Sequence, residues 1–360
     1  MTKLLFLTRL PFYPESSGGS ECFLIYLFQQ LCQMGWQIEV FCGSSLKSSH
    51  FWKSIKSTRN LKFPTVDTLL GYPCWRQPIQ VTTEQQWISH LDQLLQRFKP
   101  DVVVSHDGYM DKLLSHTAQK CYPSFYLAQW LSPIESDFSA PSTLHVLANS
   151  PYLAEKIGTT INKKVPVILP FTDLKKYQVE KDDHQFITFI NPIPAKGVEI
   201  ALKVAQALPQ ERFLFIKGKW SIGGSESSKY FLKLASKLSN IDVWEHQEDM
   251  RKVYAVTNIL LMPSQFFETF GRVILEAQIN KIPVIASKVG GIPYTLGDGG
   301  ILIDTIEDFH KYAEAIKQIR SSHTLYNKLS DAALQNTQRP EFDAKHQIQS
   351  FTDFIESHLK

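Results

Sequence analysis

The 360-residue chain lacks the signatures of several common protein classes. It has only five cysteines and no C-x-x-C pair, which argues against a disulfide framework or a zinc site. It has no D-x-D, H-E-x-x-H or Walker sequence, so nothing indicates a metal site or an ATP cradle. No apolar run at the start is long enough for a signal peptide or a membrane span. The net charge of +3 is too small to indicate nucleic-acid binding. We therefore expect a cytoplasmic protein with reduced thiols.

The composition and length predict two soluble α/β domains. Hydrophobic residues make up 43% and charged residues 20% of the chain, as in ordinary globular proteins, and 360 residues exceed the usual size of one domain. Short β-rich runs alternate with helical patterns, which is typical of parallel sheets with crossover helices. The expected strands are 4–8, 38–41, 102–105, 124–127, 145–148 and 165–169 in the first half, and 186–190, 212–217, 241–244, 259–262, 284–286 and 300–303 in the second.

A polar stretch over residues 172–185 separates the two sets of strands, and we interpret it as the linker. The predicted domains are therefore 1–174 and 175–340. The last segment, 341–360, reads as a helix that packs back toward the N-terminal domain. We expect its buried side to contain Phe342, Ile348, Phe351, Phe354 and Ile355.

Loops that follow strands are where open α/β sheets bind ligands, so we expect a cleft between the domains to form the site. Gly18 and Gly19 follow the first strand and allow close approach of the backbone or a positive φ. Ser20 is expected to cap the next helix, so this loop would offer N–H groups to a phosphate. The sequence is not G-x-G-x-x-G, and a flexible connector is the alternative.

Three other loops carry candidate residues. Lys196 stands at the start of a helix, where a lysine is poorly placed unless an anion pairs with it. Gly290 and Gly291 form another tight loop that exposes backbone. His106 follows a strand and is a catalytic candidate. The alternatives are a solvated lysine, a plain glycine turn and a histidine without a catalytic role.

Two glutamates flank the turn in the segment MPSQFFETFGRVILEAQINKIPVIAS, residues 262–287. The apolar spacing predicts a helix from Arg272 to Ile279, so Glu268 lies just before it and Glu276 lies inside it. One interpretation is that Glu268 offsets the helix dipole and that Glu276 is solvated. The other is that the N–H groups from Thr269 to Arg272 bind an anion while both acids accept hydrogen bonds from a polyol.

Taken together, these segments resemble the retaining glycosyltransferases of family 4, which have the GT-B fold. The resemblance depends on ETFGRVILEA, which matches the family's E-x7-E element through Glu268 and Glu276, and on PSQFFE, PVIASKVGGIP, GGSE and AKG around it. LANSPYLAEKI and DMRKVYAVTNILLMPS also resemble connecting segments of that family. The resemblance implies an α/β fold of two Rossmann-like, doubly wound domains that face an interdomain cleft. It also implies transfer of a sugar from a nucleotide-diphosphate sugar to an acceptor hydroxyl.

The family pattern implies a role for each matching residue. Glu268 would bind the hydroxyls of the donor sugar, Glu276 would accept the ribose hydroxyls, and Lys196 would neutralise the leaving diphosphate. Such enzymes need no metal ion and no cofactor, because cations and helix N-termini carry the developing charge. Retention would proceed without a protein nucleophile, and the leaving phosphate oxygen would assist deprotonation of the acceptor. The expected donor-binding residues are Gly18, Gly19, Asn191, Thr269, Phe270, Gly271, Arg272, Glu276, Gly290 and Gly291, and the catalytic candidates are Glu268, Lys196 and His106.

The sequence departs from the family pattern at three positions. Asn191 replaces the usual arginine five residues before Lys196, so one phosphate-binding cation is lost. Arg272 replaces an aliphatic residue, and we hypothesise that it supplies the missing charge. Tyr294 stands where the family commonly has glutamate, which alters the expected donor pocket. These departures leave open a degenerate protein that binds a sugar nucleotide without turnover.

The acceptor side is less informative. Residues 50–63, HFWKSIKSTRNLKF, mix aromatic and basic side chains, so a solvated segment or a peripheral contact with an anionic membrane at its inner face are the alternatives. A nucleotide-sugar epimerase or a phosphorylase would need acid–base or pyridoxal-phosphate patterns that the sequence does not show. The base and sugar of the donor, the acceptor and the oligomeric state stay open.

Overall fold

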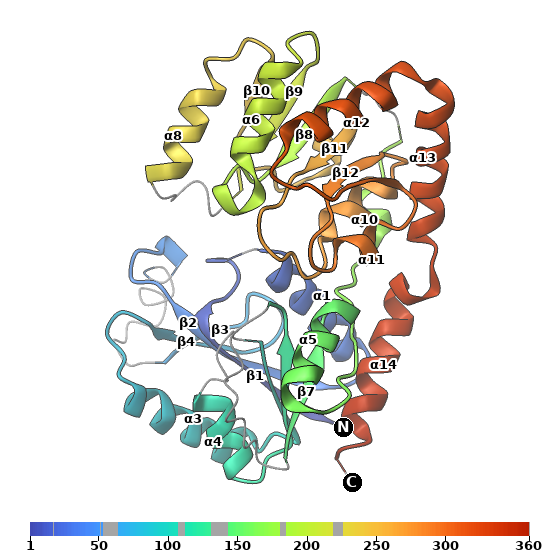
Figure 1. Cartoon of the computed structure of the whole chain (residues 1–360). Helices are drawn as coiled ribbons and strands as arrows, with labels where there is room; N and C mark the ends of the chain where they lie inside the picture. The colour runs from blue at the N-terminus through green and yellow to red at the C-terminus, as the bar shows by residue number, and fades with distance from the viewer. Residues whose placement is uncertain are drawn as a thin grey trace. The chain divides into compact units, whose positions relative to one another are not determined.

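Parallel strands and crossover helices build two separate units (Figure 1). The structure is a computed structural model that describes residues 1–16, 18–50, 52, 64–106, 112–130, 143–180, 185–218 and 226–359, with the side chains of 226–228 excluded. The first unit comprises Met1–Thr172 and Ala344–Lys360, and the second comprises Asp173–Asp343.

The first unit has a seven-stranded sheet, counted over the described residues, in the order β3-β4-β2-β1-β5-β6-β7. Neighbouring strands are parallel except β3, which is antiparallel to β4. The strands are β1 Lys3–Pro11, β2 Gln37–Ser44, β3 Thr65–Asp67, β4 Cys74–Pro78, β5 Val102–Ser105, β6 Ser124–Ala128 and β7 Leu144–Ala148. The helices are α1 Gly19–Gln33, α3 Glu84–Phe98, α4 Lys112–Gln119, α5 Pro151–Ile161 and α14 Ala344–Glu356.

The second unit has a six-stranded sheet among its described residues, in the order β10-β9-β8-β11-β12-β13, and all its strand pairs are parallel. Its strands are β8 Phe186–Ile190, β9 Phe213–Ile216, β10 Ile241–Trp244, β11 Thr257–Met262, β12 Val284–Ser287 and β13 Gly300–Ile303. Its helices are α6 Val198–Ala207, α8 Glu226–Ala235, α9 Arg251–Tyr254, α10 Arg272–Gln278, α11 Ile292–Leu296, α12 Phe309–Ser321 and α13 His323–Thr337, with short 3-10 helices η1 Leu174–Tyr177, η2 Pro194–Lys196 and η3 Pro340–Phe342.

Both faces of each sheet are covered, which explains why the strands read as continuous apolar runs. Along β1, Leu4 and Phe6 enter the cluster that contains side chains of α1 and α14. Leu5 and Leu7 enter the cluster on the opposite face, with side chains of α3 and α4. Successive side chains of a strand point to opposite faces, so both sets are buried only because helices lie on both sides.

The strand orders create a switch point in each sheet. In the first unit, β2 and β5 lie on opposite sides of β1, so the connections after β1 and β5 leave in different directions. In the second unit, β9 and β11 flank β8 in the same way. A crevice for a ligand forms beyond the carboxyl ends of strands at such a point. The residues just after β1, β5, β8 and β11 are therefore the candidates for contact with a ligand.

Three sequence predictions about the fold are wrong, and two strands were missed. Residues 165–169 form only an isolated bridge, in which Val167 pairs with Ala148, and no run of ladder bonds. The strands β3 and β4 were not expected, because the buried polar residues of CWRQP mask β4. Gly18, not Ser20, is the N-cap of α1, and its φ of −72° is not positive. Phe342 lies in η3, before the terminal helix, and its ring packs against Phe270 and Tyr294 of the second unit.

Candidate functional site

The loops after β8 and β11 are joined at the switch point of the second unit. Gln265 donates a backbone hydrogen bond of 2.9 Å to the carbonyl of Ala195. Gly197 has a φ of 82°, and a Cβ atom added there would lie 1.9 Å from the carbonyl oxygen of Pro263. Only glycine allows both that φ and that approach. Gly197 therefore allows the two loops to pack closely against each other.

Lys196 and Glu268 form an ion pair between these loops. Their side chains are 24% and 16% exposed, so solvent reaches both partners. The ammonium of Lys196 also lies 4.9 Å from the centre of the Phe266 ring, a distance that allows a cation–π contact. The structure thus brings together two predicted residues that lie 72 positions apart in the sequence. An anion could compete for Lys196, and a hydroxyl could compete for Glu268.

The glycine pair after β12 supports the loop that carries Glu268. Gly291 donates a hydrogen bond of 2.8 Å to the carbonyl of Glu268. Added Cβ atoms would lie 2.1 Å from this oxygen at Gly290 and 1.9 Å from the carbonyl oxygen of Thr269 at Gly291. Side chains at these positions would displace the backbone of the glutamate loop. The two glycines thus have a role inside the protein, separate from the predicted exposure of backbone to a ligand.

Glu276 is buried, so the interpretation of this residue as solvated is wrong. The Tyr254 hydroxyl donates to one carboxylate oxygen at 2.8 Å, and the Arg272 guanidinium donates to the other at 3.2 Å. Arg272 also donates to the Tyr177 hydroxyl at 3.0 Å. Burial, followed by the charge of Glu276, raises the pKa of Tyr254, so its hydroxyl stays protonated and donates. The charge of Arg272 is matched by Glu276, which limits what it can offer a phosphate.

The residues between the two glutamates form the start of α10. Gly271 is the N-cap, with a left-handed φ of 83°, and Thr269 and Phe270 are buried. An added Cβ at Gly271 would lie 3.1 Å from Ile274 and 3.2 Å from Met262, tighter than most such contacts. The loop is therefore tightly packed where the chain enters the helix. Anion binding by its amides stays a prediction.

Two of the departures from the family pattern have structural surroundings that the sequence did not reveal. Asn191 has a φ of 63°, and its side-chain oxygen Oδ1 is buried without a hydrogen-bond partner among the described residues. Tyr294 lies in α11, where its ring packs on the guanidinium of Arg339 at 4.7 Å and on Phe342. Tyr294 thus anchors the segment that follows α13, and Asn191 has an acceptor that a ligand could use.

In the first unit, the loop after β1 lies beside the residue after β5. Ser16 donates a hydrogen bond of 2.7 Å to Glu21, which is buried in the first turn of α1 next to Gly18 and Gly19. His106 is 1% exposed and stacks on Phe6 with ring centres 5.3 Å apart. Burial lowers the pKa of His106 to about 4, although the charge of Glu21 acts in the opposite direction. His106 is therefore a neutral imidazole at neutral pH.

Several residues that hold these loops were missed by sequence reasoning. Buried Arg76 on β4 donates to the carbonyl of Tyr13 at 2.7 Å, and Glu15 accepts a hydrogen bond of 2.7 Å from the amide of Ser45. Glu21 was visible in the GGSE motif, but no role was assigned to it. Tyr254 lies in a segment noted for the resemblance, yet a lone tyrosine gives no sequence signal. These side chains act through contacts that only the fold creates.

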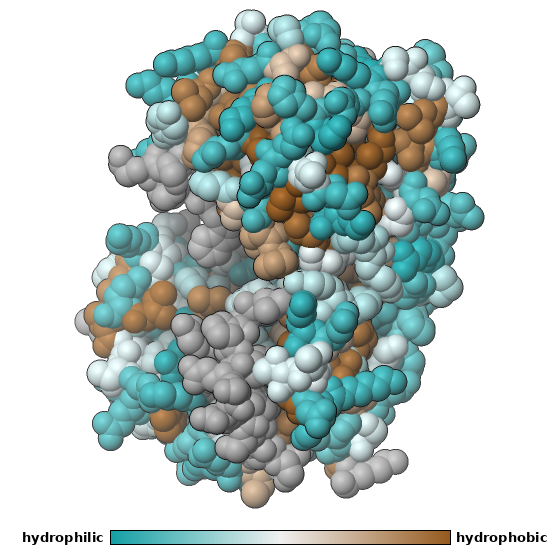
Figure 2. All heavy atoms as spheres, viewed as in Figure 1, coloured by the Kyte–Doolittle hydropathy of each residue, from teal (hydrophilic) through white to brown (hydrophobic). Residues whose placement is uncertain are grey.

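The predicted membrane-contact segment, 50–63, lies outside the described residues except for His50 and Trp52. Exposed apolar side chains occur on β3 and in the segments that follow β3 and β4: Val66, Leu69, Ile79 and Val81, and Trp52 is also exposed. Figure 2 shows apolar residues, in brown, on the viewed face of the first unit. Within the described ranges, no helix is long and apolar enough to cross a bilayer, and no three His, Cys, Asp or Glu residues are grouped so that they could hold a metal ion. Membrane contact stays a prediction.

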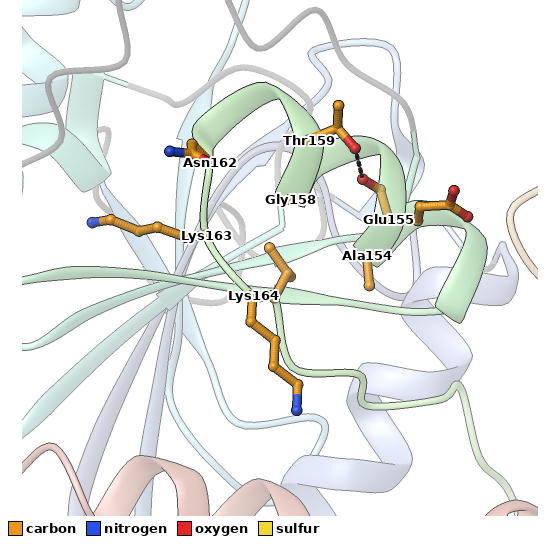
Figure 3. A pocket seen from close by; sticks show the side chains of 8 residues that line it. Ala154, Glu155, Gly158, Thr159, Asn162, Lys163 and Lys164 are labelled. Atoms are coloured by element: carbon orange, nitrogen blue, oxygen red, sulfur yellow. Dashed lines mark hydrogen bonds between the residues drawn. The ribbon is translucent and has the colours of Figure 1, made fainter.

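A shallow hollow beside α5 contains none of the predicted site residues (Figure 3). The hollow is lined by Ala154, Glu155, Gly158, Thr159, Asn162, Lys163, Lys164 and Val165. Among these residues, Thr159 donates a hydrogen bond of 2.8 Å to the carbonyl of Glu155. None of the lining residues belongs to the loops that follow β1 or β5, so we do not assign the hollow to the site.

Comparison with known proteins gives a family match for most of the second unit. Residues 171–336 match the model of the glycosyl transferases group 1. The chain is 32% identical to D-inositol 3-phosphate glycosyltransferase from Mycolicibacterium smegmatis over 145 residues, which are 38% of this chain and 33% of that protein. It is 23% identical to the lipopolysaccharide core biosynthesis glycosyltransferase LpsE from Rhizobium meliloti over 347 residues, 89% of this chain and 91% of that protein. The match thus spans about a third of the first relative.

The fold extends the similarity to the whole chain. The structure superposes on that of HepE from Anabaena in complex with UDP-glucose with a TM-score of 0.77. The two chains are 19% identical, and the superposition covers 99% of this chain and 100% of HepE. The predicted GT-B fold is thereby confirmed.

Proposed function

We propose that this chain, in which residues 171–336 carry the pattern of the glycosyl transferases group 1, transfers a sugar from a nucleotide-diphosphate sugar to an acceptor hydroxyl. The observation that carries the proposal is the pairing of Lys196 with Glu268 at the switch point of the second unit. A cation suits the leaving diphosphate, and a carboxylate suits the hydroxyls of the sugar. The UDP-glucose bound by HepE supports a nucleotide-sugar donor.

In this proposal, the donor separates the ion pair. The diphosphate takes the ammonium of Lys196, and the released carboxylate of Glu268 accepts hydrogen bonds from the sugar. Both side chains are partly exposed, so a ligand can reach them. The exchange pairs the ammonium with the diphosphate and hydrogen-bonds the carboxylate to the sugar, so neither charge is left without a polar partner in a partly buried site. Glu276, one to two turns further along, would bind the ribose hydroxyls.

Retention at the anomeric carbon and independence of metal ions are parts of the same proposal. As the bond from the sugar to the diphosphate breaks, Lys196 and the amides at Thr269 to Arg272 stabilise the negative charge on the leaving oxygen. That oxygen takes the proton of the acceptor hydroxyl, which attacks from the same face. The proposed chemistry therefore needs no protein nucleophile.

The first unit is proposed to meet the acceptor and the diphosphate. Gly18 and Gly19 would approach the phosphates, and their loop is held by Glu15 and Arg76. His106 would act as a neutral hydrogen-bonding group, since its pKa of about 4 leaves it without charge at neutral pH. A protonated His106 is not part of the proposed mechanism.

A panel of UDP-, GDP- and ADP-sugars tests the proposal. The cognate donor at about 100 times its dissociation constant should stabilise the folded chain by about 2.7 kcal/mol in thermal unfolding. The reaction is run with a metal chelator added. NMR of the product should then show the same anomeric configuration as in the donor. Stabilisation without hydrolysis or transfer would instead make the chain a binding protein. Absence of stabilisation by every nucleotide sugar in the panel would contradict both.

A further inference from the structure

The carboxylate of Glu276 is held from two sides, by a buried tyrosine and by a mostly buried arginine. Tyr254, at the end of α9, donates to one oxygen at 2.8 Å, and Arg272 donates to the other at 3.2 Å. Tyr254 is fully buried, and the side chains of Arg272 and Glu276 are 11% and 8% exposed. A buried carboxylate that is bonded at both oxygens has one orientation. Each oxygen still has a second lone pair with which it can accept a ligand hydroxyl.

The segment that enters the second unit completes this arrangement. The hydroxyl of Tyr177, in η1, accepts a hydrogen bond of 3.0 Å from Arg272. Asn280, just beyond α10, donates to the carbonyl of Tyr177 at 3.0 Å and accepts from the amide of Val179 at 2.8 Å. The stretch that we interpreted from sequence as a linker is thus fastened to α10 at residues 177–179. Its tyrosine hydroxyl contacts the arginine that holds Glu276.

We infer that Tyr254 and Tyr177 are positioning residues that fix Glu276 to bind the vicinal hydroxyls of a ribose. The inference rests on the proposed function, which makes Glu276 the ribose-binding residue. Two neighbouring hydroxyls can both bond one carboxylate only if its plane has the correct orientation. Tyr254 sets that plane directly, and Tyr177 sets it through Arg272. The pair therefore selects ribonucleotides over nucleotides that lack these hydroxyls.

The test compares nucleotides with and without the hydroxyls. Isothermal titration calorimetry of the full chain measures the dissociation constants of UDP, GDP and ADP and of their 2′,3′-dideoxy counterparts. The wild-type protein should prefer one of the ribonucleotides by at least about tenfold, since hydrogen bonds to a charged group contribute about 1.5–3 kcal/mol. In Tyr254→Phe, this preference should fall by about five- to tenfold through weaker binding of the ribonucleotide alone. Tyr177→Phe should lower it by about twofold.

Tyr312→Phe is the matched control. Tyr312 is another buried tyrosine of the second unit, and its hydroxyl bonds Ser287 at 2.7 Å and the carbonyl of Ile306 at 3.1 Å. Tyr312→Phe removes a buried hydroxyl that does not contact Glu276. The stability of the fold should therefore fall while the preference for the ribonucleotide stays unchanged.

The outcomes separate the inference from the proposed function. A wild-type chain that binds none of the three nucleotides would overturn both. A wild-type chain that binds one of them while Tyr254→Phe keeps the full preference for ribose would overturn the inference alone. Equal weakening of the ribonucleotide and its dideoxy counterpart would show a purely structural role and would also overturn it.

Discussion

The two units hold their candidate residues in different electrostatic states. In the second unit, each candidate acid has a cationic partner: Glu268 pairs with Lys196, and Glu276 pairs with Arg272. In the first unit, His106 is buried against aromatic rings and kept neutral. Paired charges suit a site that must exchange partners with a charged donor. A neutral, enclosed imidazole suits hydrogen bonding to an uncharged hydroxyl.

The largest expected effect tests the buried pair of the second unit. Glu276→Leu leaves the mostly buried Arg272 without its counter-ion and should lower the free energy of unfolding by about 3–5 kcal/mol. Urea unfolding measures this loss. The double variant Arg272→Leu/Glu276→Leu removes both charges and should be more stable than the single variant. A single variant as stable as Glu268→Gln, whose pair is partly exposed, would show that the two pairs do not differ.

The next effect concerns turnover. Lys196→Ala removes the cation proposed for the leaving diphosphate and should lower kcat by about 10²- to 10³-fold, as when one donor to a developing charge is removed. Steady-state rates with the cognate donor measure it. Lys311→Ala is the control, because Lys311 also pairs with an acid, Glu314 on α12. Equal rates in Lys196→Ala and the wild type would remove the proposed role of this pair.

The first unit should lose stability in mild acid, because two of its histidines are held in the neutral form. Burial lowers the pKa of His106 to about 4, and burial with nearby His358 lowers that of His145 to about 4. The ordinary value is about 6.5, so the unfolded chain takes up these protons first as the pH falls. The stability that these histidines contribute is therefore complete above pH 6.5 and is lost progressively toward pH 4.

Chemical unfolding from pH 7 to pH 4, followed by tryptophan fluorescence, measures this loss. His145→Gln removes one of the two groups and should flatten the profile. His346→Gln on α14 is the control, because that histidine is exposed. A profile that stays flat between pH 6.5 and pH 4 in the wild type would contradict the buried neutral state.

The smallest effect tests the partly exposed ion pair of Lys196 and Glu268. Glu268→Gln removes the internal competitor for Lys196, so the cognate nucleoside diphosphate should bind about two- to fivefold more tightly, the range set by a partly exposed ion pair. Turnover should fall in the same variant, because the sugar loses its acceptor. Calorimetry and steady-state rates measure the two changes. Weaker binding of the bare diphosphate would mean that Glu268 does not compete with it.

Sequence patterns were sufficient for most of the architecture and for choosing single candidate residues. Alternating apolar runs predicted most strands, and the spacing of Glu268 and Glu276 with the surrounding motifs led to the GT-B fold, which the structural comparison confirms. The short strand β4 was not predicted, because Arg76 and Gln77 are polar yet buried. The burial of Arg76 depends on carbonyl and carboxylate partners from other segments of the chain.

Local order and apolar period are properties of neighbouring residues, and the sequence alone determined those: two α/β halves, the helix after Gly271 and the candidate loops. Which polar groups meet depends on chain segments far apart, and only the tertiary structure decided that. Tyr254 reaches Glu276 across 22 positions, Lys196 reaches Glu268 across 72, and Tyr177 reaches Arg272 across 95. A hydrogen bond needs two atoms about 3 Å apart, and no sequence period encodes that distance between remote residues.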